Sequence, residues 1–276
     1  HLWRNSDWIS QRIETADQMS NSIPSFFAAA RGLWTLTWRS KLTKKRFIPI
    51  LANILALPIF AASVIDAGQT DDFIEILINL YFFVVIPISC LFHYGAMIRD
   101  ELQDDTMTFL ITRPVSRAKI FLLKYVTLTL WVQMIALGNG LAFWVAGMWL
   151  DISDIFPLIK QLILTQTLAV IAFGALASFI GMLTQKYLIA GIVYGFIVEF
   201  GIAQIPTDIN ILSISHNLET LLARNVDLAS AFNWSSEGSS LALAIILGGS
   251  VLFLTMGALL FHFREFHHSD EMQKSS

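Results

Sequence analysis

The chain has 276 residues, of which 55% are hydrophobic and 14% are charged, and its formal net charge at pH 7 is -3. About 25% of the residues of a soluble globular domain are charged. The deficit, with a mean hydropathy of +0.62, excludes ordinary soluble folds and predicts an all-α protein that crosses the membrane several times. The small net charge gives no support for nucleic-acid binding, and a single cysteine excludes an intrachain disulfide.

The chain opens with two segments that precede the first apolar run. Residues 1–22 are polar and lack an initiator methionine, so we interpret them as a leader or a tag. Residues 23–46 carry aromatic and apolar side chains on one helical face, including Trp34 and Trp38, and basic side chains such as Arg39 on the other. We expect an amphipathic helix in the headgroup layer, and the alternative is a solvated basic leader.

Residues 47–263 contain six apolar segments that we expect to be membrane-spanning helices. In chain order they are residues 47–65, 73–97, 117–150, 157–183, 187–205 and 240–263. The third is longer than a bilayer requires, so it should tilt or project Lys119, Lys124 and Tyr125 below the membrane.

The distribution of charge predicts the orientation of these helices. Basic residues gather in residues 31–46 and 99–124, at Lys186 and in the tail, residues 264–276, whereas the loops on the opposite side are acidic. The positive-inside rule therefore predicts a protein of the cell (inner, cytoplasmic) membrane with both termini in the cytoplasm.

The segment 99–124 is the most densely charged passage between apolar runs. A helix over residues 100–112 would place Glu101, Asp104, Asp105 and Thr108 on one face, because they lie three or four residues apart. Pro114 ends this helix. Arg113 and Arg117 follow the acidic face on either side of the proline. We expect this helix to face the cytoplasm, the headgroups or another protein.

The loop over residues 206–238 is the longest connection predicted on the outer face. Its leucines and isoleucines lie at loosely helical spacing. We therefore expect one or two short helices that dip into the outer leaflet, rather than a plain solvated loop.

Sequence motifs for catalysis or for tight metal binding are absent. The chain has no phosphate-binding G-x-x-x-x-G-K-[ST] motif, no H-E-x-x-H and no G-x-S-x-G, so we predict neither a metal site nor an ATPase site. Few polar residues lie in the apolar segments. Glu199, His93 and Asn139 are the candidates for contact with a substrate or an ion. For Glu199 the alternative is an interfacial carboxylate that is wet or hydrogen-bonded.

The segment 99–124 resembles a motif in the membrane subunits of ABC exporters of the type-2 permease family. That motif reads roughly E-x-x-x-G-T-x-E-x-L-L-x-x-P-x-S-R, followed after a few residues by Lys. The matching positions here are Glu101, Thr106, Leu110, Pro114, Ser116, Arg117 and Lys124, and the departures are Asp105, Thr108 and Ile111. The layout of the whole chain is similar as well.

The resemblance implies a permease subunit that pairs with a copy or a paralogue and binds separate ATP-binding subunits. ATP and magnesium would then belong to those subunits, and this chain would hold no cofactor. Glu101, Asp104, Asp105, Thr108, Arg113 and Arg117 would contact the ATP-binding subunit, with the helix around Trp34, Trp38 and Arg39 beside them.

Two other classes of function remain open from the sequence. An ATP-independent secondary carrier or channel would use Glu199 or His93 as a titrating group. A membrane-bound enzyme or a scaffold subunit would need clustered catalytic groups, and the sequence shows none.

Overall fold

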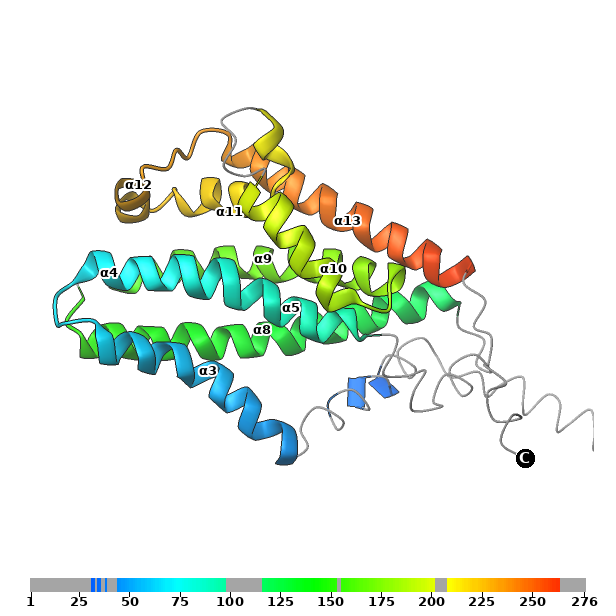
Figure 1. Ribbon diagram of the computed structural model, residues 1–276, viewed down its shortest axis with the longest axis horizontal. Coiled ribbons are helices and arrows are strands. Elements are labelled where there is room, and N and C mark those ends of the chain that lie inside the picture. Colours follow the sequence, from blue (N-terminus) through cyan, green and yellow to red (C-terminus); the bar gives the residue numbers. More distant parts are fainter. Residues whose placement is uncertain are drawn as a thin grey trace, which may run out of the picture.

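A computed structural model describes residues 31–32, 34–35, 38, 44–97, 116–152, 155–201 and 208–263. The described residues form helices and turns and contain no strand, which confirms the all-α prediction for this part of the chain. The long helices lie side by side along the longest axis of the molecule (Figure 1).

Four helices are long and apolar enough to cross a membrane. The first is continuous from Thr70 to Gly95 and consists of α4 (Thr70–Glu75), the π-helix η1 (Ile76–Val85) and α5 (Ile86–Gly95). The others are α8 (Arg117–Trp149), α9 (Ile155–Leu183) and α13 (Ser239–Phe263). They confirm the second, third, fourth and sixth predicted segments as helices of sufficient length.

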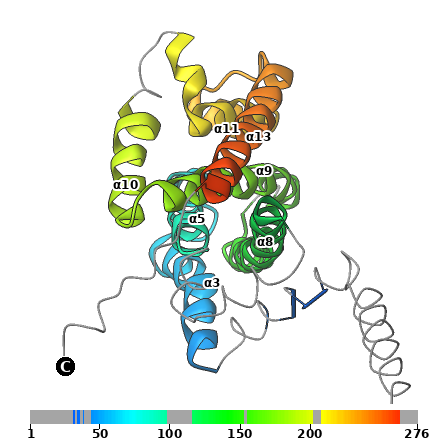
Figure 2. The same ribbon diagram turned by 90° about the vertical axis from the view of Figure 1, so that its right-hand side faces the viewer.

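The first and fifth predicted segments form shorter apolar helices. α3 (Lys44–Val64) begins with basic residues, and its stretch Ile50–Val64 is a short apolar helix. The fifth segment is α10 (Tyr187–Tyr194), which continues as the π-helix η2 (Gly195–Gly201). Seen along the bundle, α5 lies between α10 on one side and α8 and α9 on the other (Figure 2).

Tyrosine hydroxyls connect the central helices, because lipid and apolar side chains leave a polar group no other partner. Tyr81 donates to Gln166 Oε1 of α9 at 2.8 Å and to the Ala136 carbonyl of α8 at 3.2 Å. Tyr94 donates to Thr129 Oγ1 at 3.0 Å, and Tyr125 donates to the Ile171 carbonyl at 2.8 Å.

These contacts correct one expectation for α8. Tyr125 and Lys124 are buried in the bundle rather than projecting below it, each 6% exposed, whereas Lys119 is exposed as predicted. The part of α8 that carries Lys124 and Tyr125 therefore packs inside the bundle, where α8 contacts α5 and α9.

Part of the predicted amphipathic helix packs against α8. Residues 31–32, 34–35 and 38 are helical. The Trp34 and Trp38 rings stack with centroids 5.1 Å apart, and Trp38 meets the buried Trp131 edge-on at 5.2 Å. Arg39 lies outside the described residues.

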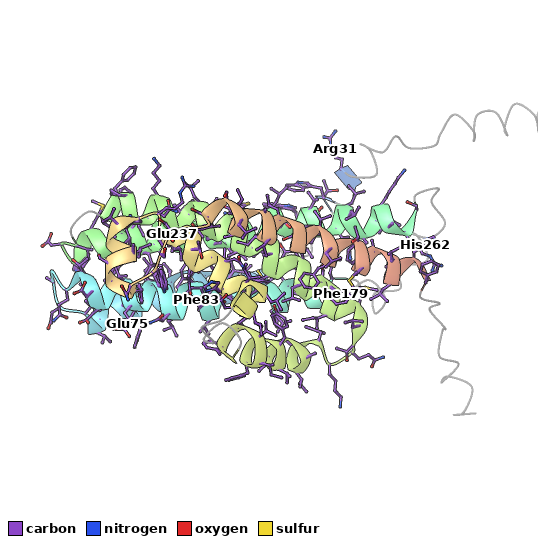
Figure 3. All side chains as sticks on the ribbon, turned by 90° about the horizontal axis from the view of Figure 1, so that it is seen from above. Arg31, Glu75, Phe83, Phe179, Glu237 and His262 are labelled. Carbon is purple, nitrogen blue, oxygen red and sulfur yellow. The ribbon has the colours of Figure 1, made fainter. Side chains whose placement is uncertain are left out.

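The 206–238 region contains three short helices in its described part. They are the 3-10 helix η4 (Asp208–Leu212), α11 (Ile214–Leu222) and α12 (Val226–Phe232). α11 packs against α9 and α13, and Gln161 of α9 donates to the Leu221 carbonyl at 2.8 Å. Seen from above, Glu237 of this region and Glu75 lie toward one end of the bundle, and His262 lies at the other (Figure 3).

Candidate functional site

Two charged side chains are buried among the described residues, and each contacts the end of a neighbouring helix. Lys124 of α8 is 6% exposed and Glu199 of η2 is 8% exposed. Removing a charge from water is costly unless it is hydrogen-bonded, so intramembrane charges are candidates for functional positions.

Both oxygens of the Glu199 carboxylate accept hydrogen bonds from this chain. Oε1 accepts from the Tyr194 hydroxyl at 2.9 Å and from the Ile214 amide at 3.2 Å. Oε2 accepts from the Ser213 hydroxyl and from the Ser215 amide, both at 2.8 Å. Four donors therefore stabilise one buried charge.

Three of these donors belong to the beginning of α11. Ser213 is its N-cap residue and accepts a further bond from the His216 amide at 3.2 Å. The first amides of a helix have no intrahelical acceptor and carry partial positive charge. Glu199 satisfies two of them, so its carboxylate fastens α11 to η2. In this structure Glu199 is therefore the hydrogen-bonded carboxylate that the sequence left open as an alternative. Its contact with a substrate stays a prediction.

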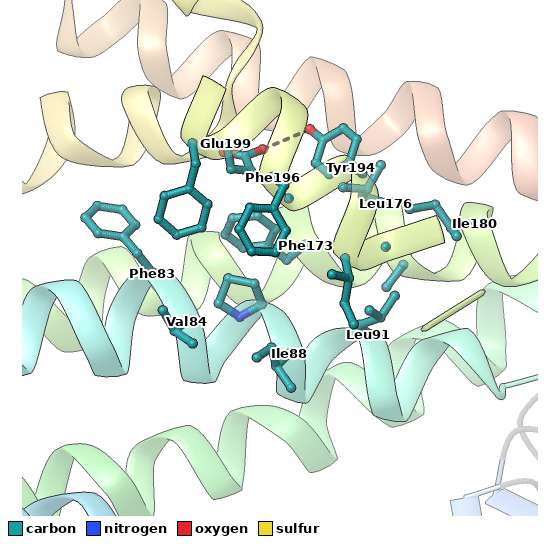
Figure 4. A pocket seen from close by; sticks show the side chains of 16 residues that line it. Phe83, Val84, Ile88, Leu91, Phe173, Leu176, Ile180, Tyr194, Phe196 and Glu199 are labelled. Atoms are coloured by element: carbon teal, nitrogen blue, oxygen red, sulfur yellow. Dashed lines mark hydrogen bonds between the residues drawn. The ribbon is translucent and has the colours of Figure 1, made fainter. Parts of the chain in front are cut away.

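Glu199 and Tyr194 also lie at the edge of an apolar pocket of about 290 Å³. Its walls come from three helices (Figure 4). The Thr70–Gly95 helix contributes Phe83, Ile88 and Leu91, and α9 contributes Phe173 and Ile180. Phe196 of η2 lies opposite, so the pocket separates the Thr70–Gly95 helix from the α10–η2 segment.

Both π-helical segments contribute to this pocket. η1 supplies Phe83 and Val84, and η2 supplies Phe196, Glu199 and Phe200. π-helices are rare and occur frequently at functional sites, because the wider turn alters which side chains face a neighbouring helix. The pocket is therefore a candidate ligand-contact surface in the described part of the chain.

A second carboxylate lies on α11 near Glu199. Burial, and after it the charge of Glu199, raises the pKa of Glu219 to about 7. His216 lies one turn earlier, with Nδ1 3.8 Å from Glu219 Oε2, and burial lowers the pKa of its imidazole. Glu219 is thus the group in this region that changes charge near neutral pH.

Replacing Glu219 with glutamine should stabilise the protein at high pH. Folded Glu219 keeps its proton up to about pH 7, whereas the unfolded side chain loses it near its ordinary value of 4.5. Stability therefore falls as pH rises through this window, and glutamine removes the loss. Thermal unfolding should show a stabilisation of at most about 3 kcal/mol at pH 8, which declines toward zero near pH 4.5. The exposed Glu237 of the same region supplies a matched control, since Glu237→Gln removes a surface carboxylate without changing a buried one.

The structure does not bring the other two predicted contact residues to this pocket. His93 of α5 is half-buried, with Nδ1 2.8 Å from the Ser89 carbonyl oxygen. Asn139 is 2% exposed and lies between α8 and α3, where its amide donates to the Ile135 carbonyl at 3.2 Å and to Asn53 Oδ1 at 3.5 Å.

Most residues of the predicted coupling surface lie outside the described part of the chain. These are Glu101, Asp104, Asp105, Thr108 and Arg113. Arg117 is the first residue of α8 and is half-buried. Ser116 precedes it with an extended backbone, but its side chain makes no capping hydrogen bond.

Sequence reasoning missed the two helix-end contacts of Lys124 and Glu199. Lys124 donates to a backbone carbonyl and two of the four donors to Glu199 are backbone amides, and residue types alone do not predict such partners. A charged residue inside an otherwise apolar segment was the available signal.

Comparison with known proteins identifies the family. A model of the ABC-2 family of transporter proteins matches residues 39–201, which is more than half of the chain. No curated protein matches the chain. The match includes the Thr70–Gly95 helix, α8, α9 and the charged segment that connects the first two. The chain therefore belongs to the ABC-2 family of transporter proteins and is a multi-pass membrane protein.

Proposed function

We propose that this chain is the permease subunit of an ATP-driven ABC exporter, which forms the translocation pathway as a dimer and is moved by separate ATP-binding subunits. The observation that carries the proposal is the family match over residues 39–201, because it includes the charged segment between two long apolar helices. The chain itself has no phosphate-binding motif. ATP and magnesium would therefore be bound by the partner.

In this proposal α3 and the α10–η2 segment complete a set of six spans. Both are apolar, and α10 has no buried residue. Its exposed side chains, among them Ile189 and Ile192, would face lipid or the second permease subunit, whether a copy or a paralogue. An even number of spans agrees with the charge distribution, which favours both termini in the cytoplasm.

The acidic face of residues 100–112 would bind the ATP-binding subunit. Glu101, Asp104 and Asp105 are the central contacts, with Thr108, Arg113 and Arg117 around them. A charged helix held between two long helices can transmit a partner's displacement into the membrane.

The pocket favours an apolar or amphipathic cargo. Its walls are apolar, and the side chains of the Thr70–Gly95 helix and of η2 meet across it. The same surfaces would line the pathway between two permease subunits.

The alternative of an ATP-independent carrier has less support. Such a carrier needs a carboxylate or imidazole that exchanges protons or ions with the pathway. Both oxygens of Glu199 already accept bonds from protein donors, and His93 lies outside the pocket lining.

Reversing the acidic face should detach the ATP-binding subunit. In a Glu101→Lys, Asp104→Lys variant, opposite charges across the interface become like charges, which cost several kcal/mol in a desolvated contact. The affinity-tagged variant should insert normally but lose the ATP-binding subunit that copurifies with the wild-type chain. A Lys119→Met variant is the control. Full retention of the subunit by the double variant would show that this face is not the contact.

A further inference from the structure

A buried hydrogen bond joins the residue before the connection 98–115 to α8, the helix that follows the connection. Met97 precedes this connection and Ser116 follows it. Lys124, two turns into α8, donates from Nζ to the Met97 carbonyl oxygen at 2.6 Å and is 6% exposed.

The position of Met97 explains why a lysine can be buried there. α5 ends at Gly95 with Ala96 as its C-cap, so Met97 is the first residue beyond the carboxyl end of the helix, and Lys124 lies beside that end. The last carbonyls of a helix lack intrahelical donors and carry partial negative charge, and a cation is stabilised beside them. The ammonium group of Lys124 thus joins α8 to the end of α5.

The same end of α5 is also held by α9 and α10. A methyl group at Gly181 of α9 would collide with the Gly95 carbonyl oxygen, so the two backbones are in direct contact. The Tyr187 ring of α10 covers the other side of Gly95. The preceding residue, Tyr94, packs against Gly174 and donates to Thr129 of α8. Small residues allow this close approach, and the close approach makes the joint stiff.

We infer that Lys124 is a positioning residue that makes the two ends of the 98–115 connection move as one body. With the bond in place, force applied to the connection displaces α5 and α8 together, and α9 follows through Gly95 and Gly181. Without it, the connection can move relative to α5, and the pocket side chains of the Thr70–Gly95 helix are not displaced. This inference rests on the proposed function, in which an ATP-binding subunit supplies the force.

The closing experiment measures nucleotide-driven movement on the far side of the bundle. Val226 of α12 is 79% exposed, and the only native cysteine, Cys90, is buried. A Val226→Cys chain, purified with its ATP-binding subunit and reconstituted in lipid nanodiscs, is labelled with a water-soluble maleimide. The labelling rate is compared with and without ATP and vanadate, and ATP hydrolysis and thermal unfolding are measured on the same samples.

In the otherwise wild-type complex, ATP and vanadate should change the labelling rate. Lys124→Met should abolish this change while the complex still assembles and hydrolyses ATP, and Lys124→Arg should restore it. Lys119→Met, an exposed lysine at the same end of α8, should behave like the wild type. If the Lys124→Met complex fails to assemble, the same measurement is made on Lys124→Gln. The inference predicts that this variant also loses the change in labelling rate.

Two results would overturn the inference. One is a full nucleotide response in the Lys124→Met or Lys124→Gln complex. The other is a lowered melting temperature with an unchanged response, which indicates a purely structural contact. A third result, a wild-type chain that copurifies with no ATP-binding subunit, would contradict the proposed function. It differs from the two results above, which require the complex to assemble.

Discussion

A Gly181→Leu variant should fail to form a stable bundle. The Gly95 backbone lies where the first side-chain carbon would be, and a backbone cannot rotate away as a flexible side chain can. Overpacking of a well-packed core costs typically 1–3 kcal/mol even where side chains adjust. Here α5 and α9 must separate, so we expect a loss at or above the upper end, out of a total stability of about 5–15 kcal/mol. Membrane-inserted yield and thermal unfolding in detergent would measure it.

Gly248 of α13 supplies the matched control for that substitution. It also lies inside a long helix, but within the described residues no atom beyond its chain neighbours and its own helix backbone lies within 4 Å of the position that a first side-chain carbon would occupy. Gly248→Leu should therefore be tolerated, and leucine's better helix propensity contributes up to about 1 kcal/mol in its favour. Equal behaviour of the two variants would mean that the contact between Gly95 and Gly181 does not determine the packing of α5 on α9.

Replacing Glu199 with alanine should release α11 from η2. The change leaves the amides of Ile214 and Ser215 and the Ser213 hydroxyl without their shared acceptor. Each hydrogen bond to a charged group contributes about 1.5–3 kcal/mol, so we expect several kcal/mol of local destabilisation. Hydrogen exchange of the peptide covering residues 208–222 should accelerate strongly, while exchange in α8 should stay slow.

Two further variants sharpen that prediction. Glu199→Gln keeps one acceptor oxygen but turns an NH₂ group toward N–H or O–H donors. Hydrogen exchange of the 208–222 peptide in this variant should therefore be faster than in the wild type and slower than in the alanine variant. Glu237→Ala, at an exposed glutamate of the same region, should leave exchange in α11 unchanged. If Glu199→Ala left α11 as protected as in the wild type, the carboxylate would not be its anchor.

The long apolar helices were predictable from sequence, and the partners of their buried charges were not. Hydropathy and length identify α8, α9, α13 and the Thr70–Gly95 helix, because every spanning helix must satisfy its own backbone within an apolar run. The same criteria predict the fifth segment over residues 187–205, of which residues 202–205 lie outside the described part of the chain. A continuous apolar run also carries no signal for the change from α to π geometry in η1 and η2.

The prediction that Lys124 projects below the membrane was wrong, and its contacts show why. Such side chains usually extend toward water, and the sequence offers no acidic partner within a helical turn. The acceptor is a backbone carbonyl 27 residues earlier in the chain. Glu199 is similar, since three of its four donors come from residues 14–16 positions later, across the connection into α11. Backbone partners at such separations depend on tertiary structure alone.

The candidate ligand surface was predicted only in part. The sequence identifies the second and fifth segments as apolar helices, and the structure places the pocket between them, at the Thr70–Gly95 helix and η2. The contribution of α9 through Phe173 and Ile180 was not predicted, because an apolar residue in a central helix gives no sign of which neighbour it faces.

The most direct test of the account is the composition of the complex purified from native membranes through an affinity tag on this chain. The account predicts that an ATP-binding subunit with its own phosphate-binding loop is recovered in an amount equal to this chain, and that the complex hydrolyses ATP. Recovery of the folded, membrane-inserted chain without any ATP-binding protein, under conditions that preserve other ABC complexes, would contradict it.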